Sequence, residues 1–196
     1  MIRYFPGIPD GEFVRGDIPM TKQEVRMVAL AKARISPEDI IIDVGAGTGS
    51  LSIEAACQAP RGQVFAIERE REGIELINQN AVKFQVSNLE TIHGLAPAAM
   101  ADLPAANVII IGGTGGHLRS VLTKADDNLQ PGGRLITMAV TVETLHTTLD
   151  WARTAGGYQV EACGLQVNRL RPVGSSHMFE AFNQVYIIAC TKAESQ

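Results

Sequence analysis

The sequence is poor in aromatic residues and in cysteine, and both shortages restrict what the chain can be. Phe, Trp and Tyr make up 5% of the 196 residues, so aliphatic side chains must build the core. The three cysteines, Cys57, Cys163 and Cys190, are scattered and include no CxxC pair. This spacing argues against a zinc site and a disulfide framework, and predicts reduced thiols in a reducing compartment.

Long apolar runs and a surplus of positive charge are also missing. No stretch approaches the ~20 apolar residues of a membrane helix, and the segment MIRYFPGIPDGEF has no continuous apolar run typical of a signal peptide. The net charge is −4, whereas nucleic-acid binders usually carry a basic surplus that displaces counterions from phosphates. We therefore expect a cytoplasmic protein without membrane, nucleic-acid or metal binding.

What the sequence does have is glycine and enough apolar residues for one core. Nineteen of the 196 residues are glycine, near a tenth of the chain against a usual share of about 7%. The apolar fraction of 45% is sufficient for an ordered domain of this length. The sequence predicts a single domain over residues 1–196, with an irregular N-terminal arm over residues 1–20.

The hydrophobic pattern predicts five β-α units followed by two terminal strands. Strands are expected at 40–44, 63–68, 89–93, 107–111 and 134–140, and helices at 21–35, 50–59, 70–84, 97–101, 118–128 and 142–154. The first helix would begin with the capping box Thr21-x-x-Glu24. The last 40 residues predict two strands joined by a loop over 171–183.

This order of elements predicts an α/β fold with a mostly parallel seven-stranded sheet, an antiparallel C-terminal strand and helices on both faces. Right-handed crossovers would bring the carboxyl ends of the parallel strands to one edge. Open sheets of this kind bind ligands at that edge. Both glycine clusters of the sequence follow such strand ends.

The first glycine cluster lies between the strand expected at 40–44 and a helix. It reads GxGxG after Asp43, whereas a dinucleotide fingerprint would read GxGxxG. Glycines permit a sharp turn and the close approach of a ligand, and the following helix N-terminus favours a carboxylate or phosphate. GxGxG after an acidic residue is typical of S-adenosylmethionine binding, here by Gly45, Ala46, Gly47, Thr48 and Gly49.

Two further strand ends complete the expected cofactor site. Glu68 ends the second strand, where a carboxylate can accept hydrogen bonds from both hydroxyls of a ribose. The third strand is followed by Gly94, Leu95 and Ala96, and Leu95 stands where many such enzymes have an acidic residue. We expect the adenine to rest on apolar contacts and on the backbone of Ala96.

The second glycine cluster, GGTGG, follows the strand expected at 107–111. It contains neither the (N/D)PP(Y/F) tetrapeptide of amino-group methyltransferases nor the cysteine that cytosine methylation needs. The segment Gly113, Thr114 and Gly115 offers backbone N–H donors and few side chains. Because loops at strand ends carry function in this architecture, this one predicts a floor for a bulky acceptor.

On these motifs the chain resembles the cobalt-precorrin C(15)-methyltransferase (decarboxylating) family of cobalamin biosynthesis. The resemblance covers nearly the whole chain and lies in GIPDGEFVRGDIPMTKQEVR, DVGAGTG, GGTGG and PGGRLI. It implies a Rossmann-like class I methyltransferase fold, S-adenosylmethionine as cofactor, a corrinoid substrate and a homotetramer. The implied reaction is methylation at C(15) of a cobalt-precorrin of the precorrin-6B/7 type, with decarboxylation of the C(12) acetate chain.

The resemblance also implies roles for single residues. Cofactor contacts fall on Thr21, Gly45 to Gly49, Glu68 and Ala96, although Thr21 could instead act only as a helix cap. A corrin ring bears many carboxylates, so an acidic protein needs local cations to hold it. The candidates are Arg15, Lys22, Arg26, Arg119, Arg169 and Arg171, beside the loop residues Gly113, Thr114 and Gly115. His117 and His177 are possible proton donors, and no catalytic residue is assigned.

Three other functions stay open at this point. A tRNA adenine methyltransferase would share the core and would bind heparin through a basic face. A nucleotide-binding oxidoreductase would bind NAD and not S-adenosylhomocysteine. A non-catalytic S-adenosylmethionine-binding module would bind the cofactor without turnover.

Overall fold

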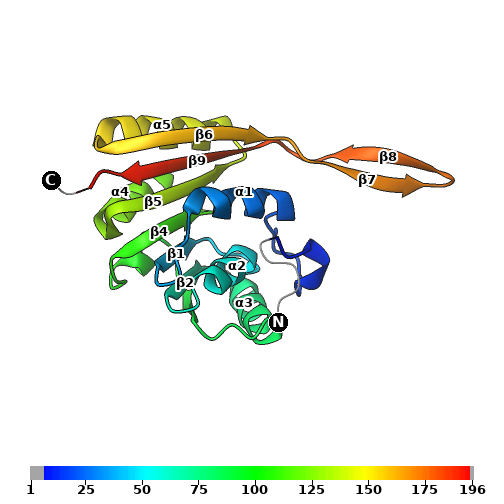
Figure 1. Cartoon of the computed structure of the whole chain (residues 1–196), viewed down its shortest axis with the longest axis horizontal. Helices are drawn as coiled ribbons and strands as arrows, with labels where there is room; N and C mark the ends of the chain where they lie inside the picture. The colour runs from blue at the N-terminus through cyan, green and yellow to red at the C-terminus, as the bar shows by residue number, and fades with distance from the viewer. Residues whose placement is uncertain (1–6, 195–196) are drawn as a thin grey trace.

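The computed structural model describes residues 7–194 and has a seven-stranded sheet at its centre (Figure 1). The strand order is β3-β2-β1-β4-β5-β9-β6. The strands are β1 Ile40–Val44, β2 Gln63–Glu68, β3 Leu89–His93, β4 Ala106–Ile111, β5 Leu129–Ala139, β6 Tyr158–Leu165 and β9 Val185–Lys192. β1 to β5 pair in parallel, and β9 is antiparallel to β5 and β6. The sheet expected from the sequence is confirmed.

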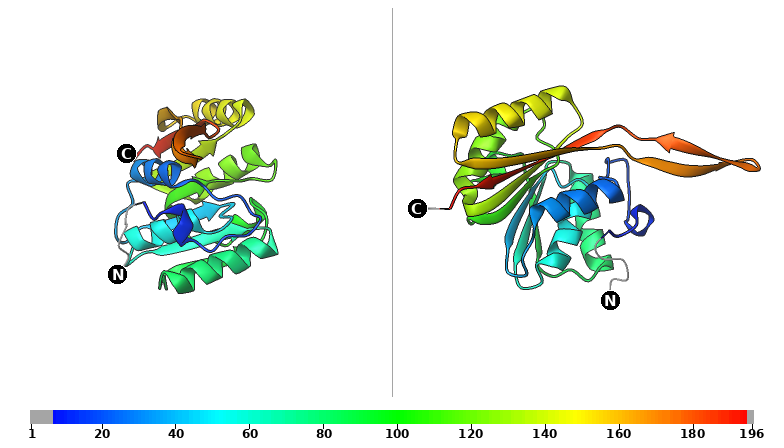
Figure 2. Two further views of the ribbon diagram at one scale, coloured as in Figure 1. Left: turned by 90° about the vertical axis from the view of Figure 1, so that its right-hand side faces the viewer. Right: turned by 45° about the horizontal axis from the view of Figure 1, so that its top comes forward.

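Helices cover both faces of the sheet, as expected (Figures 1 and 2). They are α1 Gln23–Ala33, α2 Ser50–Gln58, α3 Arg71–Lys83, α4 Leu118–Asn128 and α5 Val142–Ala155, with short 3-10 turns η1 Asp10–Glu12 and η2 Ala98–Met100. α1 and α2 pack with one apolar cluster of the sheet, and α4 and α5 pack with the cluster on the opposite face. Within residues 7–194, no helix is both long and apolar enough to cross a bilayer.

The central strands β1 and β4 are apolar except for Asp43 and Asn107, because both of their faces are covered. In β1, Ile41 packs toward α1 and α2, whereas Ile42 and Val44 pack toward the opposite face. The same alternation runs through β4. β1 and β4 are adjacent and parallel, so the loops that follow them lie at the same edge of the sheet.

The predicted capping box at the start of the first helix is wrong. α1 begins at Gln23, its N-cap is Lys22, and no side chain makes a capping hydrogen bond there. The Glu24 carboxylate is instead hydrogen bonded to Arg169, near the end of the chain. A partner distant in sequence thus competes with the local cap.

The loop predicted over 171–183 is wrong as well. The strands β7 Asn168–Val173 and β8 Ser176–Ala181 form a separate antiparallel ribbon that projects beyond the sheet (Figures 1 and 2). A two-residue turn joins them, with Gly174 at φ +59° as such tight hairpin turns require. The described side chains of β8 are all exposed, so no burial pattern marks this strand in the sequence.

The arm lies against the helices and is held by buried charges. The fully buried Arg26 donates to Glu54 at 2.9 Å and to Asp10 at 2.8 Å. Glu54 also accepts the backbone N–H groups of Gly7 and Ile8. Burial alone would raise the pKa of Asp10, but hydrogen bonds from Arg26 and Arg169 outweigh it and hold that pKa below its ordinary value. Arg26 is therefore closed to a substrate.

Replacing Arg26 by methionine tests this role of the buried charges. We expect Arg26→Met to lower the free energy of unfolding by about 3–5 kcal/mol, because it leaves Glu54 and Asp10 without their buried partner. Urea unfolding measures the change. The matched control is Arg153→Met at the exposed pair with Asp150, which should stay within about 0.5 kcal/mol of the wild type. Equal midpoints for both variants would contradict the role.

Candidate functional site

Two glycine loops meet where the order of strands in the sheet reverses. The chain passes from β1 to its neighbour β2 on one side, and β4 lies on the other side. Gly45 has a φ of +74°, and a Cβ at this position would lie 2.4 Å from the carbonyl oxygen of Gly113. The N–H of Gly113 in turn donates to the carbonyl of Val44 at 3.2 Å. The two loops are thus in direct backbone contact, which a side chain at residue 45 would prevent.

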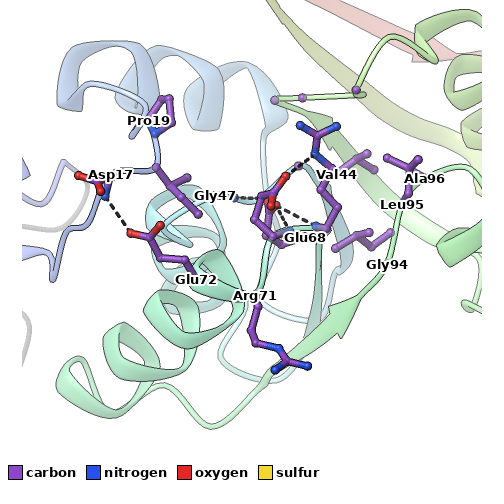
Figure 3. A pocket seen from close by; sticks show the side chains of 18 residues that line it. Asp17, Pro19, Val44, Gly47, Glu68, Arg71, Glu72, Gly94, Leu95 and Ala96 are labelled. Carbon is purple, nitrogen blue, oxygen red and sulfur yellow. Dashed lines mark hydrogen bonds and ion pairs between the residues drawn. The ribbon is translucent and has the colours of Figure 1, made fainter.

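A cavity of about 680 Å³ opens beside these loops (Figure 3). The arm, both glycine loops, the ends of β2 and β3 and the first turn of α3 contribute to it. Its lining consists of Asp17, Ile18, Pro19, Val44, Gly45, Gly47, Ile67 to Glu72, Gly94 to Ala96, Gly112, Gly113 and Gly115. A volume of this size lies within the range of small-molecule and cofactor sites, about 300–1,000 Å³.

Glu68 is held at the cavity by backbone groups (Figure 3). Its Oε2 accepts the N–H of Gly47 at 2.9 Å, and its Oε1 accepts the N–H groups of Arg69 and Glu70, each at 2.8 Å. The residue is only 7% exposed. Since a carboxylate has about four acceptor positions, capacity remains for a ligand hydroxyl. The carboxylate is therefore fixed in place before any ligand arrives.

Two residues of α3 support this arrangement and were missed from the sequence. A Cβ at Gly73 would lie 2.5 Å from Cγ of Glu68, so only glycine permits this packing. Glu72 accepts the backbone N–H of Asp17 at 2.8 Å and so holds the arm at the cavity. The one available signal was a glycine inside a helical pattern, which often has a packing or functional reason.

Leu95 and Ala96 form an apolar part of the same cavity wall. Ala96 is buried, while Leu95 is partly exposed. The second glycine loop bends toward this rim, because a Cβ at Gly115 would lie 2.9 Å from Nη1 of Arg69 and 3.3 Å from Cδ1 of Leu95. The residues expected to hold the adenine thus line the cavity. The loop Gly94 to Ala96 contributes no acidic side chain to it.

A second cavity of about 410 Å³ adjoins the first and shares Pro19, Gly45, Gly47 and Gly112 with it. Its other walls come from the arm, α1, α2, the end of β5 and the segment between β8 and β9. The remaining lining residues are Met20, Thr21, Lys22, Val25, Ala46, Leu51, Met138, Val140, Phe182, Asn183 and Val185. The predicted residues Thr21, Lys22 and Ala46 are thus brought together here.

Other predicted residues lie outside both cavities. Thr48 is buried, and Gly49 is the N-cap of α2, where it packs on Ile77. Arg15 is exposed on the arm, and Thr114 lies in the second loop without lining either cavity. The structure therefore brings together only part of the predicted set.

Two of the predicted cations, Arg169 and Arg119, already have carboxylate partners. Arg169 donates to Glu24 at 3.0 Å and to Asp10 at 2.7 Å. Arg119 pairs with Asp150 at 2.7 Å. Their guanidinium groups are thus committed to carboxylates of the protein itself.

Asp43 lies buried beneath the first glycine loop. Its Oδ2 accepts the hydroxyl of Ser52 at 2.5 Å, and its Oδ1 has no hydrogen-bond partner within residues 7–194. Burial raises the pKa of Asp43 to about 6, and the nearby Glu68 charge adds to the rise. Its bond to Ser52 joins the end of β1 to the first turn of α2.

The donor set favours binding of a polar organic ligand. Backbone N–H groups at the start of α2 favour a carboxylate, since the first turn of a helix has N–H groups without partners in the helix. In the described part of the chain, no cluster of three or more His, Cys, Asp or Glu is placed to hold a metal. The sheet order, the reversed strand and the GxGxG loop together define the fold of class I methyltransferases.

Comparison with known proteins gives the family. Residues 12–192 match the family model of the precorrin methyltransferase domain, and the chain belongs to this family. A curated relative from Salmonella typhimurium, cobalt-precorrin-6B C(15)-methyltransferase (decarboxylating), is 40% identical over 95% of this chain and 96% of its own length. The resemblance stated from the sequence is confirmed.

Solved structures agree with this assignment. Precorrin-6y C5,15-methyltransferase from Geobacter metallireducens is 36% identical, with a TM-score of 0.89 over 95% of this chain and 98% of that chain. Precorrin 8w decarboxylase from Methanobacterium thermoautotrophicum is 32% identical, with a TM-score of 0.87 over 93% of this chain and 98% of that chain.

Proposed function

We propose that this protein methylates C(15) of cobalt-precorrin-6B with S-adenosylmethionine and decarboxylates the C(12) acetate chain of the same substrate, in cobalamin biosynthesis. The observation that carries the proposal is the meeting of two glycine loops beside the fixed carboxylate of Glu68. The identity of 40% to the Salmonella relative supports the choice of acceptor.

The residues of the first cavity fit this cofactor. Glu68 would accept hydrogen bonds from the ribose hydroxyls, and Leu95 with Ala96 would hold the adenine. The N–H groups of the first turn of α2 would meet the carboxylate of the methionine part. The N–H groups of Gly45, Ala46, Gly47 and Gly49 already donate to acceptors of the protein, so these residues would line the cofactor and shape the turn beside it. Thr21 would contribute from the adjoining cavity. When bound, S-adenosylmethionine supplies a methyl group on a positively charged sulfur.

The protein's part in the reaction is positioning and the exclusion of water. The acceptor ring supplies an electron-rich carbon, so methyl transfer needs no strong base from the chain. Gly113 and Gly115 would form a floor without side chains beneath the acceptor. In the decarboxylation the bond between the acetate CH2 and its carboxylate breaks, carbon dioxide leaves, and the conjugated ring takes up the electron pair. A proton from water then completes the methyl group at C(12), and the chain orients the acetate.

An acidic protein with reduced thiols suits a cytoplasmic enzyme of small-molecule metabolism better than an RNA-modifying enzyme. The net charge of −4 gives no general attraction to phosphates. Cys57, Cys163 and Cys190 are all free thiols. The activity test must therefore distinguish methylation of the corrinoid from methylation of tRNA.

The activity test uses the purified protein with cobalt-precorrin-6B and S-adenosylmethionine. We expect S-adenosylhomocysteine and carbon dioxide to form in equal amounts, because one substrate molecule undergoes both steps. Mass spectrometry of the corrinoid product should show one added methyl group and one lost carboxyl group. Methyl transfer to tRNA with none to the corrinoid would overturn the proposal.

The cofactor site is tested by Glu68→Gln. We expect the Kd of S-adenosylhomocysteine to rise about 10- to 100-fold, because the amide loses charged hydrogen bonds to the ribose and turns a donor toward backbone N–H groups. Isothermal titration calorimetry measures the Kd. The control Glu75→Gln, at an exposed position of the following helix α3, should leave it unchanged. An unchanged Kd for Glu68→Gln would refute this ribose site.

We further propose that the protein is a homotetramer and that the ribbon β7–β8 contributes to its interface. Leu170 and Phe179 are paired across the two strands and are 59% and 74% exposed. Val173 and Met178 are exposed as well. A two-stranded ribbon is marginally stable alone in water, so a second copy that covers these side chains would stabilise it.

Light scattering after gel filtration tests the oligomer. We expect four times the mass of one chain for the wild type, and a smaller assembly for the double variant Leu170→Glu, Phe179→Glu, because charges cannot be buried unpaired in an apolar contact. The control Val82→Glu, at an exposed apolar side chain of α3, should keep the wild-type mass. A monomeric wild type would contradict the proposal.

A further inference from the structure

Lys22 and Phe182 form an unusual pair at the second cavity. Nζ of Lys22 lies 5.3 Å from the ring centroid of Phe182, and both residues line the cavity. The guanidinium of Arg169 lies 5.4 Å from the same ring. Phe182 thus holds the lysine side chain by a cation–π contact at the cavity wall.

Lys22 is the cation here that the protein does not neutralise. Arg169 takes Glu24 and Asp10, and Arg26 takes Asp10 and Glu54. None of the ion pairs within residues 7–194 includes Lys22. The carboxylates of Asp10, Glu24 and Glu54 are therefore paired with the two arginines and not with Lys22. The ammonium group of Lys22 keeps its capacity to bind an anion.

The position of Lys22 also opposes the helix dipole. Lys22 is the N-cap of α1, where the positive end of the dipole disfavours a cation. Its side chain makes no capping hydrogen bond that would compensate. Among residues 7–194, the cation–π contact with Phe182 offsets this cost only in part, and a bound anion would offset it further.

The rest of the cavity suits an apolar ring. Met20, Leu51, Met138 and Val140 belong to its walls, together with the amide of Asn183. Its shared wall with the first cavity consists of Pro19 and three glycines, Gly45, Gly47 and Gly112. A ligand in the second cavity would therefore lie directly beside a ligand in the first.

We infer that the 410 Å³ cavity is the subsite for one edge of the acceptor ring, and that Lys22, held by Phe182, binds a peripheral carboxylate of that ring. This inference rests on the proposed function. It selects Lys22 among the candidate cations, and it makes the enzyme specific for an acceptor that carries an ionised carboxylate, rather than an amide, at that edge.

The test compares Lys22→Met and Lys22→Gln with Lys22→Arg. We expect the first two to raise the KM for cobalt-precorrin-6B about 10- to 100-fold, the range for a lost hydrogen bond to a charged group. Lys22→Arg keeps the charge and should keep most of the affinity. The matched control is Lys83→Met, because Nζ of Lys83 also lies over a ring, 5.8 Å from the centroid of Phe84, away from both cavities.

Two further measurements separate the possible roles of Lys22. The Kd of S-adenosylhomocysteine should be unchanged in all four variants, and the KM of the wild type should rise more steeply with salt than that of Lys22→Met. Thermal melting should show the Lys22 variants as stable as the wild type, since removing a cation from a helix N-terminus does not destabilise it. Lys83→Met should melt slightly lower but stay folded, because it loses a favourable cation in the last turn of α3 and a hydrogen bond to the carbonyl of Glu12.

The outcomes distinguish this inference from the proposed function. A wild type that turns over cobalt-precorrin-6B, with an unchanged KM in Lys22→Met and Lys22→Gln, would overturn the inference alone. An equal rise in KM and in the Kd of S-adenosylhomocysteine would also overturn it, because Lys22 would then act on the cofactor. A wild type that binds S-adenosylhomocysteine and leaves the corrinoid unchanged would overturn the proposed function.

Discussion

The backbone contact between Gly45 and Gly113 is the constraint on which the site depends. Adjacent parallel strands, β1 and β4, deliver both loops to one edge of the sheet, and both loops come so close that no Cβ fits between them. The consequence is a wall made mostly of glycine backbone, completed by Pro19 of the arm, with one cavity beside Glu68 and another beside Phe182. A thin wall with few side chains lets two ligands approach each other, and a group transfer requires this approach.

The second dependency is the placement of the arm by buried charges. The arm contributes few core side chains, chiefly Ile8, Phe13 and Met20, so apolar packing alone gives it little specificity. Arg26 and Glu54 supply directional contacts instead. Buried ion pairs are weak evidence of net stability because desolvation offsets their attraction. Their evident effect here is geometric: they bring residues 17–22 to both cavities, and Asp10 joins the arm to Arg169 at the base of the ribbon.

The sequence predicted the sheet well because burial on both faces leaves a strong signal. The strands 40–44, 63–68 and 89–93 have the predicted bounds, and Glu68 and Ala96 line the predicted cofactor cavity. The ribbon β7–β8 was not predicted from the sequence, because its mostly exposed side chains follow no burial pattern. The ion pair between Arg169 and Asp10 was not predicted for another reason. The two residues lie 159 positions apart, and local sequence patterns carry no information on such pairs.

The net negative charge now has a structural meaning. In a chain with more carboxylates than cations, a guanidinium near the site finds a protein partner first, as Arg26 and Arg169 do. In the subsite that we infer, a carboxylate of the substrate would then bind the cation of the second cavity, Lys22, which has no ion pair within residues 7–194. The two arginines neutralise the protein carboxylates near the cavity, which would otherwise repel a substrate carboxylate. Phe182 holds the ammonium of Lys22 by a cation–π contact, which leaves the positive charge in place. An acidic protein can in this way bind an acidic substrate, because its own ion pairs determine where the attraction remains.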